Sequence, residues 1–334
     1  MLRWTIPVIA ALMLLSGQAA LASQPERGVV RTLVDTNNAL CHNPEGIAAS
    51  PKGLLYAAGT SGNICVYTRS GERVRVIPVA AGHALLGELF VDGQIYVADN
   101  NGDFSGGRVI RVDATSGAVT TIASGFLNTN AFAMDEAGRL FVSDSFAGAV
   151  YTVNTRTGAT ARWKQDEALR SHGIPGFGAN GLAFGNDGRY LYVANTGDDR
   201  IFRIAVNSNG TAGAMTVFAD GAAINAAMGT THALDGADGI VFDRKGNLWV
   251  CANQTNEIQV LSPSGRLIAR YRGTASNAMD FPASPVFFKH ALYVANLALG
   301  TAPKGGKISV LGTNVTGAPL VPRHGDDDDE GDDD

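Results

Sequence analysis

The chain has 334 residues, of which 45% are hydrophobic and 7% aromatic, and it contains 41 glycines. Its net charge of −5 is concentrated at the C-terminus, because residues 326–334 hold eight acidic side chains and the rest carries a small positive excess. A chain without a basic stripe lacks the surface that nucleic-acid binding requires, so we expect no nucleic acid as partner. Many glycines with few aromatic residues fit short, buried strands joined by tight turns.

Residues 1–22 form a predicted secretory signal peptide. They combine Arg3 with an apolar run and a small-x-small sequence at Ala20–Ala22, which predicts cleavage before Ser23. The alternative is a retained anchor, but the apolar run is short against the ~20 residues of a membrane span. No other segment is apolar enough to cross a bilayer. We therefore expect a secreted or periplasmic chain with no membrane span after signal removal.

A sequence pattern recurs six times along the chain. A lead residue is followed by a short apolar run, a glycine turn and a second apolar run, as in NGLAFGNDGRYLYVAN from Asn180. Each second run carries one aromatic marker, and the six markers are Tyr56, Tyr96, Phe141, Tyr192, Trp249 and Tyr293. A repeat of 40 to 57 residues built from short strands and glycine turns predicts an all-β, six-bladed β-propeller with four-stranded blades.

The strands of the fourth repeat are expected, from the innermost outwards, at 181–185, 190–195, 200–206 and 214–219. Outer strands of other blades are expected at 73–79, 118–123, 159–164 and 267–272. The sixth repeat lacks a clear outer strand, whereas residues 29–35 form a strand that precedes the first repeat. We predict that this N-terminal strand completes the last blade and closes the ring, which removes two exposed sheet edges. The propeller should span residues 23–319, and a disordered acidic tail should follow at 320–334.

The three cysteines cannot all pair within one chain. In the oxidising compartment that a signal peptide implies, Cys41 and Cys65 are candidates for a disulfide, since both lie close to the first repeat. The alternative is that both stay reduced, because sequence spacing does not determine geometry. Cys251 lies in an apolar run and is expected to be a buried thiol.

The lead residues share one position of the repeat, so a propeller places them at one height around its axis. In chain order they are Glu45, Leu86, Asn130, Asn180, Asp238 and Ser284. Two carboxylates and two amide carbonyls among them fit one hard divalent cation, with Ca²⁺ favoured and Mg²⁺ or Mn²⁺ as alternatives. Zn²⁺ is disfavoured because the ring holds no Cys or His. The structural alternative is that Asn or Asp before glycine only forms a turn.

With these motifs the chain resembles the regucalcin, gluconolactonase and luciferin-regenerating enzyme family of six-bladed propellers, related to diisopropylfluorophosphatase and paraoxonase. The resemblance covers nearly the whole mature chain and rests on NPEGIA at Glu45, TNAFAMDEAGRLF at Asn130, GANGLAF at Asn180 and DGADGIVFDRKGNLWVC at Asp238. It implies that Glu45, Asn180 and Asp238 bind one divalent metal. It also implies that Asn130 contributes to metal or substrate binding, and that Asp238 is the general base or nucleophile.

One position departs from the family pattern. Sugar-lactone hydrolases of the family carry an Arg two residues before the position of Asn130, where it helps to hold the substrate, and this chain has Asn128 there. Asn128 is therefore a candidate substrate contact, while an acidic sugar lactone is disfavoured as substrate. His172 and His232 lie in long inserts before inner strands and are further candidates for substrate binding or proton transfer, although loop histidines are often incidental.

The resemblance implies a metal-dependent hydrolase of a lactone or related ester. The cation stabilises the negative charge that develops on the substrate carbonyl oxygen, while Asp238 activates water or attacks directly. The alternative is a non-catalytic propeller that binds a protein or glycan and carries a structural metal. Because propellers serve both roles, the fold alone does not choose between them.

Overall fold

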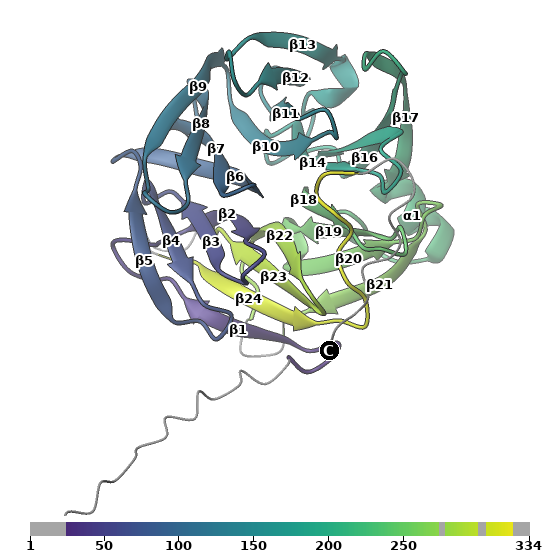
Figure 1. Ribbon diagram of the computed structural model, residues 1–334. Helices are drawn as coiled ribbons and strands as arrows, with labels where there is room; N and C mark the ends of the chain where they lie inside the picture. The colour runs from purple at the N-terminus through teal and green to yellow at the C-terminus, as the bar shows by residue number, and fades with distance from the viewer. Residues whose placement is uncertain (1–24, 274–277, 300–304, 323–334) are drawn as a thin grey trace, which may run out of the picture.

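The computed structural model describes residues 25–273, 278–299 and 305–322. Within these residues the chain forms 24 strands in six four-stranded antiparallel sheets, arranged as blades around one axis (Figure 1). The predicted six-bladed β-propeller is thereby confirmed. The predicted signal peptide at 1–22 and the acidic residues 326–334 lie outside the described residues.

Each of the first three blades consists of four consecutive strands, with the innermost strand first. Blade 1 contains β2 (Pro44–Ala49), β3 (Leu55–Gly59), β4 (Asn63–Tyr67) and β5 (Arg73–Pro78). Blade 2 contains β6 (His83–Val91), β7 (Gln94–Asn101), β8 (Gly107–Asp113) and β9 (Val119–Phe126). Blade 3 contains β10 (Thr129–Met134), β11 (Arg139–Asp144), β12 (Ala149–Asn154) and β13 (Thr160–Gln165).

The next two blades repeat this order. Blade 4 contains β14 (Ala179–Phe184), β15 (Tyr190–Asn195), β16 (Arg200–Val206) and β17 (Ala212–Asp220). Blade 5 contains β18 (Ala237–Phe242), β19 (Leu248–Ala252), β20 (Glu257–Leu261) and β21 (Leu267–Arg272). The four strands predicted for the fourth repeat are therefore confirmed, and the outermost is three residues longer than the apolar run that predicted it.

The sixth blade joins the two ends of the propeller. It contains β22 (Pro282–Phe288), β23 (Ala291–Asn296), β24 (Lys307–Gly312) and, as its outermost strand, β1 (Val30–Asp35). β1 pairs antiparallel with β24, and Val30 stands opposite Leu311. The predicted closure of the ring by the N-terminal strand is confirmed, so the first and last parts of the propeller are held by main-chain hydrogen bonds.

Hydrophobic clusters fill all six interfaces between neighbouring blades. Phe141 of blade 3 is fully buried, and its ring contacts Phe184 of blade 4 at 5.0 Å and Trp163 at 5.1 Å between centroids. All six aromatic markers of the repeat are buried in these interfaces. The markers recur because each blade packs one large ring against a neighbour, and this packing makes the propeller a rigid support for its loops.

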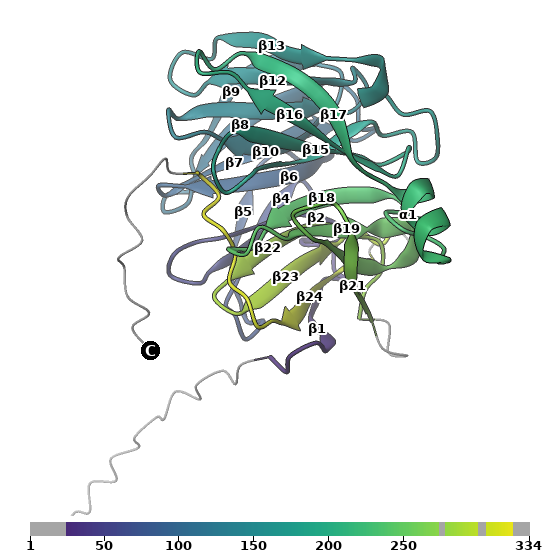
Figure 2. The same ribbon diagram turned by 90° about the vertical axis from the view of Figure 1, so that its right-hand side faces the viewer.

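The two ends of the axis differ in what covers them. The six inner strands begin at one end, which we call the front face, and the opposite end is the back face. Short helices lie in front-face connections, namely η1 (Glu167–Leu169), α1 (Gly221–Met228) and η2 (Asn253–Thr255). Residues 313–322 cross the back face, where Gly317 bridges Asp243 and Val321 packs between blades 2 and 3. Figure 2 shows α1 and this segment on opposite sides of the molecule.

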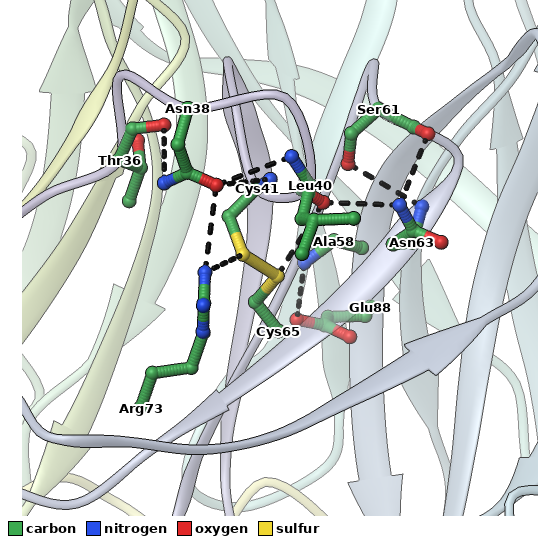
Figure 3. Close-up of a disulfide and its surroundings, with 10 residues drawn as sticks. All are labelled: Thr36, Asn38, Leu40, Cys41, Ala58, Ser61, Asn63, Cys65, Arg73 and Glu88. Atoms are coloured by element: carbon green, nitrogen blue, oxygen red, sulfur yellow. Dashed lines mark hydrogen bonds between the residues drawn. A yellow bond between two sulfur atoms is a disulfide. The ribbon is translucent and has the colours of Figure 1, made fainter.

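A disulfide joins the two candidate cysteines, Cys41 and Cys65, with 5.9 Å between the Cα atoms (Figure 3). It ties the segment that enters blade 1 to the third strand of that blade. Cys251 in β19 is a free, fully buried thiol, which agrees with the prediction. Among the described residues, no helix is long and apolar enough to cross a membrane.

Candidate metal centre on the propeller axis

The pairing between the inner strand and its neighbour is irregular at the lead position of every blade. In blade 4 the register passes from Ala179 opposite Asn195 to Leu182 opposite Val193, so Asn180 lies within the irregular step. A bulge of this kind bends the strand and re-aims one side chain. The repeat therefore presents one residue from each blade at the front end of the axis.

The register corrects one predicted lead residue. Each lead stands three residues before the partner of the aromatic marker, as Asp238 stands three residues before Val241, which pairs with Trp249. In blade 6 Val286 pairs with Tyr293, so the lead is Ala283 and the prediction of Ser284 was wrong by one residue. The lead of this blade is apolar, and a one-residue shift along a strand moves a side chain to the opposite face.

The glycine after the lead residue allows neighbouring inner strands to touch near the axis. A Cβ atom added to Gly181 would overlap the carbonyl oxygen of Asp238, and one added to Gly46 would overlap that of Leu86. No side chain fits at either position, which explains why glycine recurs there. The same close approach places the lead residues of adjacent blades side by side.

The two carboxylates among the lead residues are buried, and each has an oxygen without a hydrogen-bond partner. Glu45 is 4% exposed and Asp238 is 5% exposed. Within the described residues, Glu45 Oε2 and Asp238 Oδ1 have no partner, whereas Asp238 Oδ2 accepts a hydrogen bond from Asn253 Nδ2 at 2.9 Å. A buried anionic oxygen without a donor is costly, so this pair fits a bound cation.

The pKa values of the two carboxyl groups also indicate buried negative charge without a positive partner. Burial raises the pKa of Asp238 to about 7, and hydrogen bonds from Asn253, Asn180 and the Gly239 backbone oppose the rise. Burial also raises the pKa of Glu45 well above its ordinary value, and the negative charge of Asp238 adds to this rise. Burial without a positive partner has this effect on carboxyl groups, and a bound cation would reverse it.

The amides of the ring are held so that their carbonyl oxygens are left for a ligand. Asn130 Nδ2 donates to Ser145 Oγ at 3.1 Å, and Asn180 Nδ2 donates to Thr196 Oγ1 at 2.8 Å. Ser145 and Thr196 directly follow the second strand of the same blade, where Asn253 stands in blade 5. Each of these three blades thus orients its own lead residue, and the amide oxygens suit a hard cation.

Glu88 is a third carboxylate near the axis, and the sequence analysis missed it. It follows the lead Leu86 by two residues, where the other blades have Ile47, Phe132, Leu182, Ile240 and Pro285. Glu88 Oε1 accepts a hydrogen bond from Ala58 N at 3.2 Å (Figure 3), while Oε2 is buried and has no partner in the described part of the chain. Burial raises the pKa of Glu88, whose charge in turn raises that of Glu45. The sequence signal for Glu88 was an acidic residue at a repeat position that is apolar in the other five blades.

The candidate histidines lie in front-face loops, and each is paired with an aspartate. His172 Nδ1 lies 2.8 Å from Asp198 Oδ2, and the hydrogen bond and charge of Asp198 raise the pKa of His172. His232 Nδ1 lies 2.8 Å from Asp235 Oδ2. Both imidazoles are more than half exposed, and among the described residues neither is hydrogen-bonded to a lead residue. The structure does not bring them into the candidate metal centre.

Asn128, the expected substrate contact, is fully buried. Its Nδ2 donates to the carbonyl oxygen of Phe104 at 2.6 Å, and its backbone N–H donates to Asp144 Oδ1 at 3.0 Å. Asn128 therefore anchors the connection between β7 and β8, which carries Phe104 on the front face. Any effect of Asn128 on a substrate would act through that connection.

The described residues contain no group of three or more His, Cys, Asp or Glu side chains that is able to hold a metal. A metal centre on this axis thus depends on a mixed set, in which the amides of Asn130 and Asn180 join the carboxylates of Glu45 and Asp238. Such an oxygen set suits Ca²⁺ or Mg²⁺ better than Zn²⁺.

Comparisons with known proteins agree with this architecture. Residues 92–296, more than half of the chain, match the SMP-30/Gluconolactonase/LRE-like region. No curated protein sequence matches the chain.

Three solved structures illustrate the shared fold. The chain is similar to the calcium-binding protein regucalcin from Agrobacterium tumefaciens, with a TM-score of 0.61 and 18% identity over 87% of this chain and 95% of that one. It is similar to a luciferin-regenerating enzyme, with a TM-score of 0.64 and 17% identity over 88% and 99% of the two chains. A gluconolactonase from Xanthomonas campestris has a TM-score of 0.61 and 18% identity over 90% and 93%. At these identities the structural likeness shows the fold alone, whereas the match over residues 92–296 shows the family. The chain belongs to the SMP-30/gluconolactonase/LRE-like family.

Proposed function

We propose that the protein is a metal-dependent hydrolase of a lactone or related ester, with one divalent cation on the propeller axis. The observation that carries this proposal is the pair of buried oxygens without partners, Glu45 Oε2 and Asp238 Oδ1, in one ring with two oriented amides. Membership of a family that includes gluconolactonases supports the reaction class. Ca²⁺ is the favoured ion, because it takes several carboxylate and amide oxygens in a flexible geometry, whereas Mg²⁺ usually keeps several waters.

The residues of the candidate metal centre have different roles in the proposed reaction. When bound, the cation supplies Lewis-acid stabilisation of negative charge on the substrate carbonyl oxygen. Asn253 holds Asp238 Oδ2. Oδ1 is the oxygen left for the cation, and the carboxylate accepts the proton of an attacking water. Asp238 then returns that proton to the alkoxide that leaves when the ester C–O bond breaks, and the products are a carboxylic acid and an alcohol. Glu45, Asn130 and Asn180 would hold and orient the cation in this scheme.

Metal binding by the mature protein is the first test. Calorimetry should find one tight Ca²⁺ site per chain that is lost in Glu45→Gln and in Asp238→Asn. Glu72→Gln, at an exposed position of blade 1, is the matched control and should bind as wild type does. The acidic C-terminus contributes equally to all these proteins, so it cannot produce the difference.

Hydrolysis of simple lactones is the second test. Asp238→Asn should lose at least about 10²-fold in kcat, because the substitution removes both the general base and a ligand of the ion. A protein that binds the ion as expected and hydrolyses no lactone or ester would instead be a propeller that binds a protein or glycan around a structural metal.

We further propose that the protein is secreted or periplasmic. The Cys41–Cys65 disulfide supports export, because disulfides form and persist in oxidising compartments. Mass spectrometry of the exported protein should find an N-terminus at Ser23, and recovery of an intact N-terminus from the cytoplasm would contradict this proposal.

A further inference from the structure

Three phenylalanines from separate front-face connections contact one another. The ring of Phe177 lies 5.4 Å from that of Phe146 and 6.2 Å from that of Phe104 between centroids. Phe104 lies between β7 and β8, Phe146 between β11 and β12, and Phe177 between β13 and β14. All three side chains are half-buried, so part of each remains exposed. We call these three residues the phenylalanine cluster.

Hydrogen bonds attach this cluster to the candidate metal centre. Phe146 directly follows Ser145, whose Oγ accepts the hydrogen bond from Asn130 Nδ2. The carbonyl oxygen of Ser145 accepts a hydrogen bond at 3.2 Å from the backbone N–H of Gly178, directly after Phe177. Phe146 and Phe177 therefore lie on backbone segments that are hydrogen-bonded to each other, and Ser145 of the first segment also supports the amide of Asn130.

Phe104 is held in a conformation that its side chain disfavours. Its φ of 66° lies in the left-handed region, which is uncommon for a bulky residue. Its N–H donates to the carbonyl of Asn101 at 2.8 Å, and its carbonyl accepts from Asn128 Nδ2 at 2.6 Å. Strain of this kind persists only where the surroundings enforce it, and it gathers at ligand sites. Asn128 thus serves to present Phe104.

Two arginines near the cluster are already paired. Arg170 Nη1 donates to the carbonyl of Phe146 at 3.0 Å, and Arg170 Nε lies 3.3 Å from Glu167. Arg108 Nη2 lies 2.6 Å from the buried carboxylate of Asp99. Both guanidinium groups thus already have an acidic partner within the protein.

Negative charge lies next to the cluster as well. Asp103 is exposed beside Phe104, and hydrogen bonds from Ser105 lower its pKa, so it stays ionised at neutral pH. Asn128, which holds the carbonyl of Phe104, is buried and neutral. An anionic substituent would meet repulsion here, whereas an apolar one would cover aromatic surface.

We propose that the phenylalanine cluster binds an apolar alkyl or aryl substituent of an uncharged lactone or ester. This inference rests on the proposed hydrolase function and names its substrate class. Transfer of an apolar group from water onto these rings is favourable, by about fourfold in equilibrium constant for each fully buried methylene group. The cluster would therefore select substrates by the size of their apolar substituent.

A series of γ-lactones that share one ring and differ only in an alkyl substituent, from methyl to heptyl, tests the proposal on the Ca²⁺-loaded mature protein. We expect wild-type kcat/KM to rise at least about tenfold from the methyl to the heptyl compound. In Phe146→Ala and Phe177→Ala this ratio should fall about fivefold or more. Phe288→Ala, a half-buried phenylalanine on the back face against Arg69, should keep the wild-type ratio.

Three results would overturn the proposal: a flat wild-type series, an unchanged ratio in both cluster variants, or faster turnover of an anionic sugar lactone than of the heptyl lactone. Ca²⁺ affinity and melting temperature of each variant show whether its fold and metal centre are intact. If the wild type hydrolyses none of these lactones, the hydrolase function fails separately. Calorimetric binding of the heptyl lactone then decides the role of the cluster, since it should weaken in Phe146→Ala and not in Phe288→Ala.

Discussion

Asn253 Nδ2 donates a hydrogen bond to Asp238 Oδ2 at 2.9 Å and leaves Asp238 Oδ1 as a buried oxygen without a partner in the described residues. Asn253 stands just after the second strand of its blade, as Ser145 and Thr196 do in theirs. In three blades, therefore, a polar side chain just after the second strand orients the lead residue of the inner strand.

Loss of the hydrogen bond from Asn253 to Asp238 should weaken metal binding without abolishing it. In Asn253→Ala, the pKa of Asp238 should rise further, because one of the hydrogen bonds that oppose the rise is lost. We expect Ca²⁺ affinity at pH 7 to fall about 10- to 100-fold, the usual cost of losing a group that orients a ligand. Calorimetry measures it, with Asn186→Ala as control, since Asn186 Nδ2 donates to the Asp243 carbonyl far from the front face. Equal affinity in the two variants would contradict this role of Asn253.

The metal-free protein should lose stability as pH rises. The pKa of Asp238 is about 7 in the folded protein and about 4 in an unfolded chain, so the folded state binds more protons between these values. The free energy of unfolding should fall from about pH 4 to about pH 7, and Glu45 contributes in the same direction. Asp199, with a pKa of about 6, adds to the slope.

Denaturant unfolding with a chelator, at intervals from pH 4 to pH 8, measures this slope. Asp238→Asn should flatten it in part, and the contribution of Asp199 should persist. Apparent Ca²⁺ affinity should rise with pH up to about 7, because the ion competes with the proton on Asp238. Stability that increases over the same interval would refute the account of these carboxyls.

Glu88→Gln should stabilise the metal-free protein at pH 8. The substitution removes a negative charge whose Oε2 is buried without a partner, and it relieves the repulsion that raises the pKa of Glu45. We expect a gain of about 1–2 kcal/mol in the free energy of unfolding. Ca²⁺ affinity should fall at the same time, since one negative charge near the ion is lost. A loss of stability in the metal-free variant would show that Glu88 has another partner.

Gly181→Ala should separate blades 4 and 5 at the front end of the axis. The new Cβ would overlap the carbonyl oxygen of Asp238, which belongs to a strand that cannot easily move. We expect a loss of about 2–4 kcal/mol in the free energy of unfolding. Gly185→Ala in the same blade is the control, because a Cβ there meets its nearest neighbour, Tyr192, at 3.4 Å. Similar melting temperatures for the two variants would contradict the close approach.

Sequence alone determined the number of blades, their strand order and the closure of the ring. Each of the first five blades consists of consecutive strands, so apolar runs, glycine turns and one buried aromatic marker repeat locally and can be counted. The unpaired strand at 29–35 could only complete the blade that lacked an outer strand, and β1 does so. The positions of Glu45, Asn130, Asn180 and Asp238 within the repeat were predictable for the same reason, because the blades share one register.

Only the tertiary structure decided which side chains meet at the axis and around it. Ala283 rather than Ser284 leads blade 6 because pairing with β23, not local polarity, sets the register. Glu88 approaches Glu45 from a neighbouring blade, and Phe104, Phe146 and Phe177 meet from three connections. These residues are separated by some 30 to 70 positions in the chain. A periodic pattern records which face of its own strand a residue occupies, whereas contacts across the axis depend on how blades pack and on where irregular connections run.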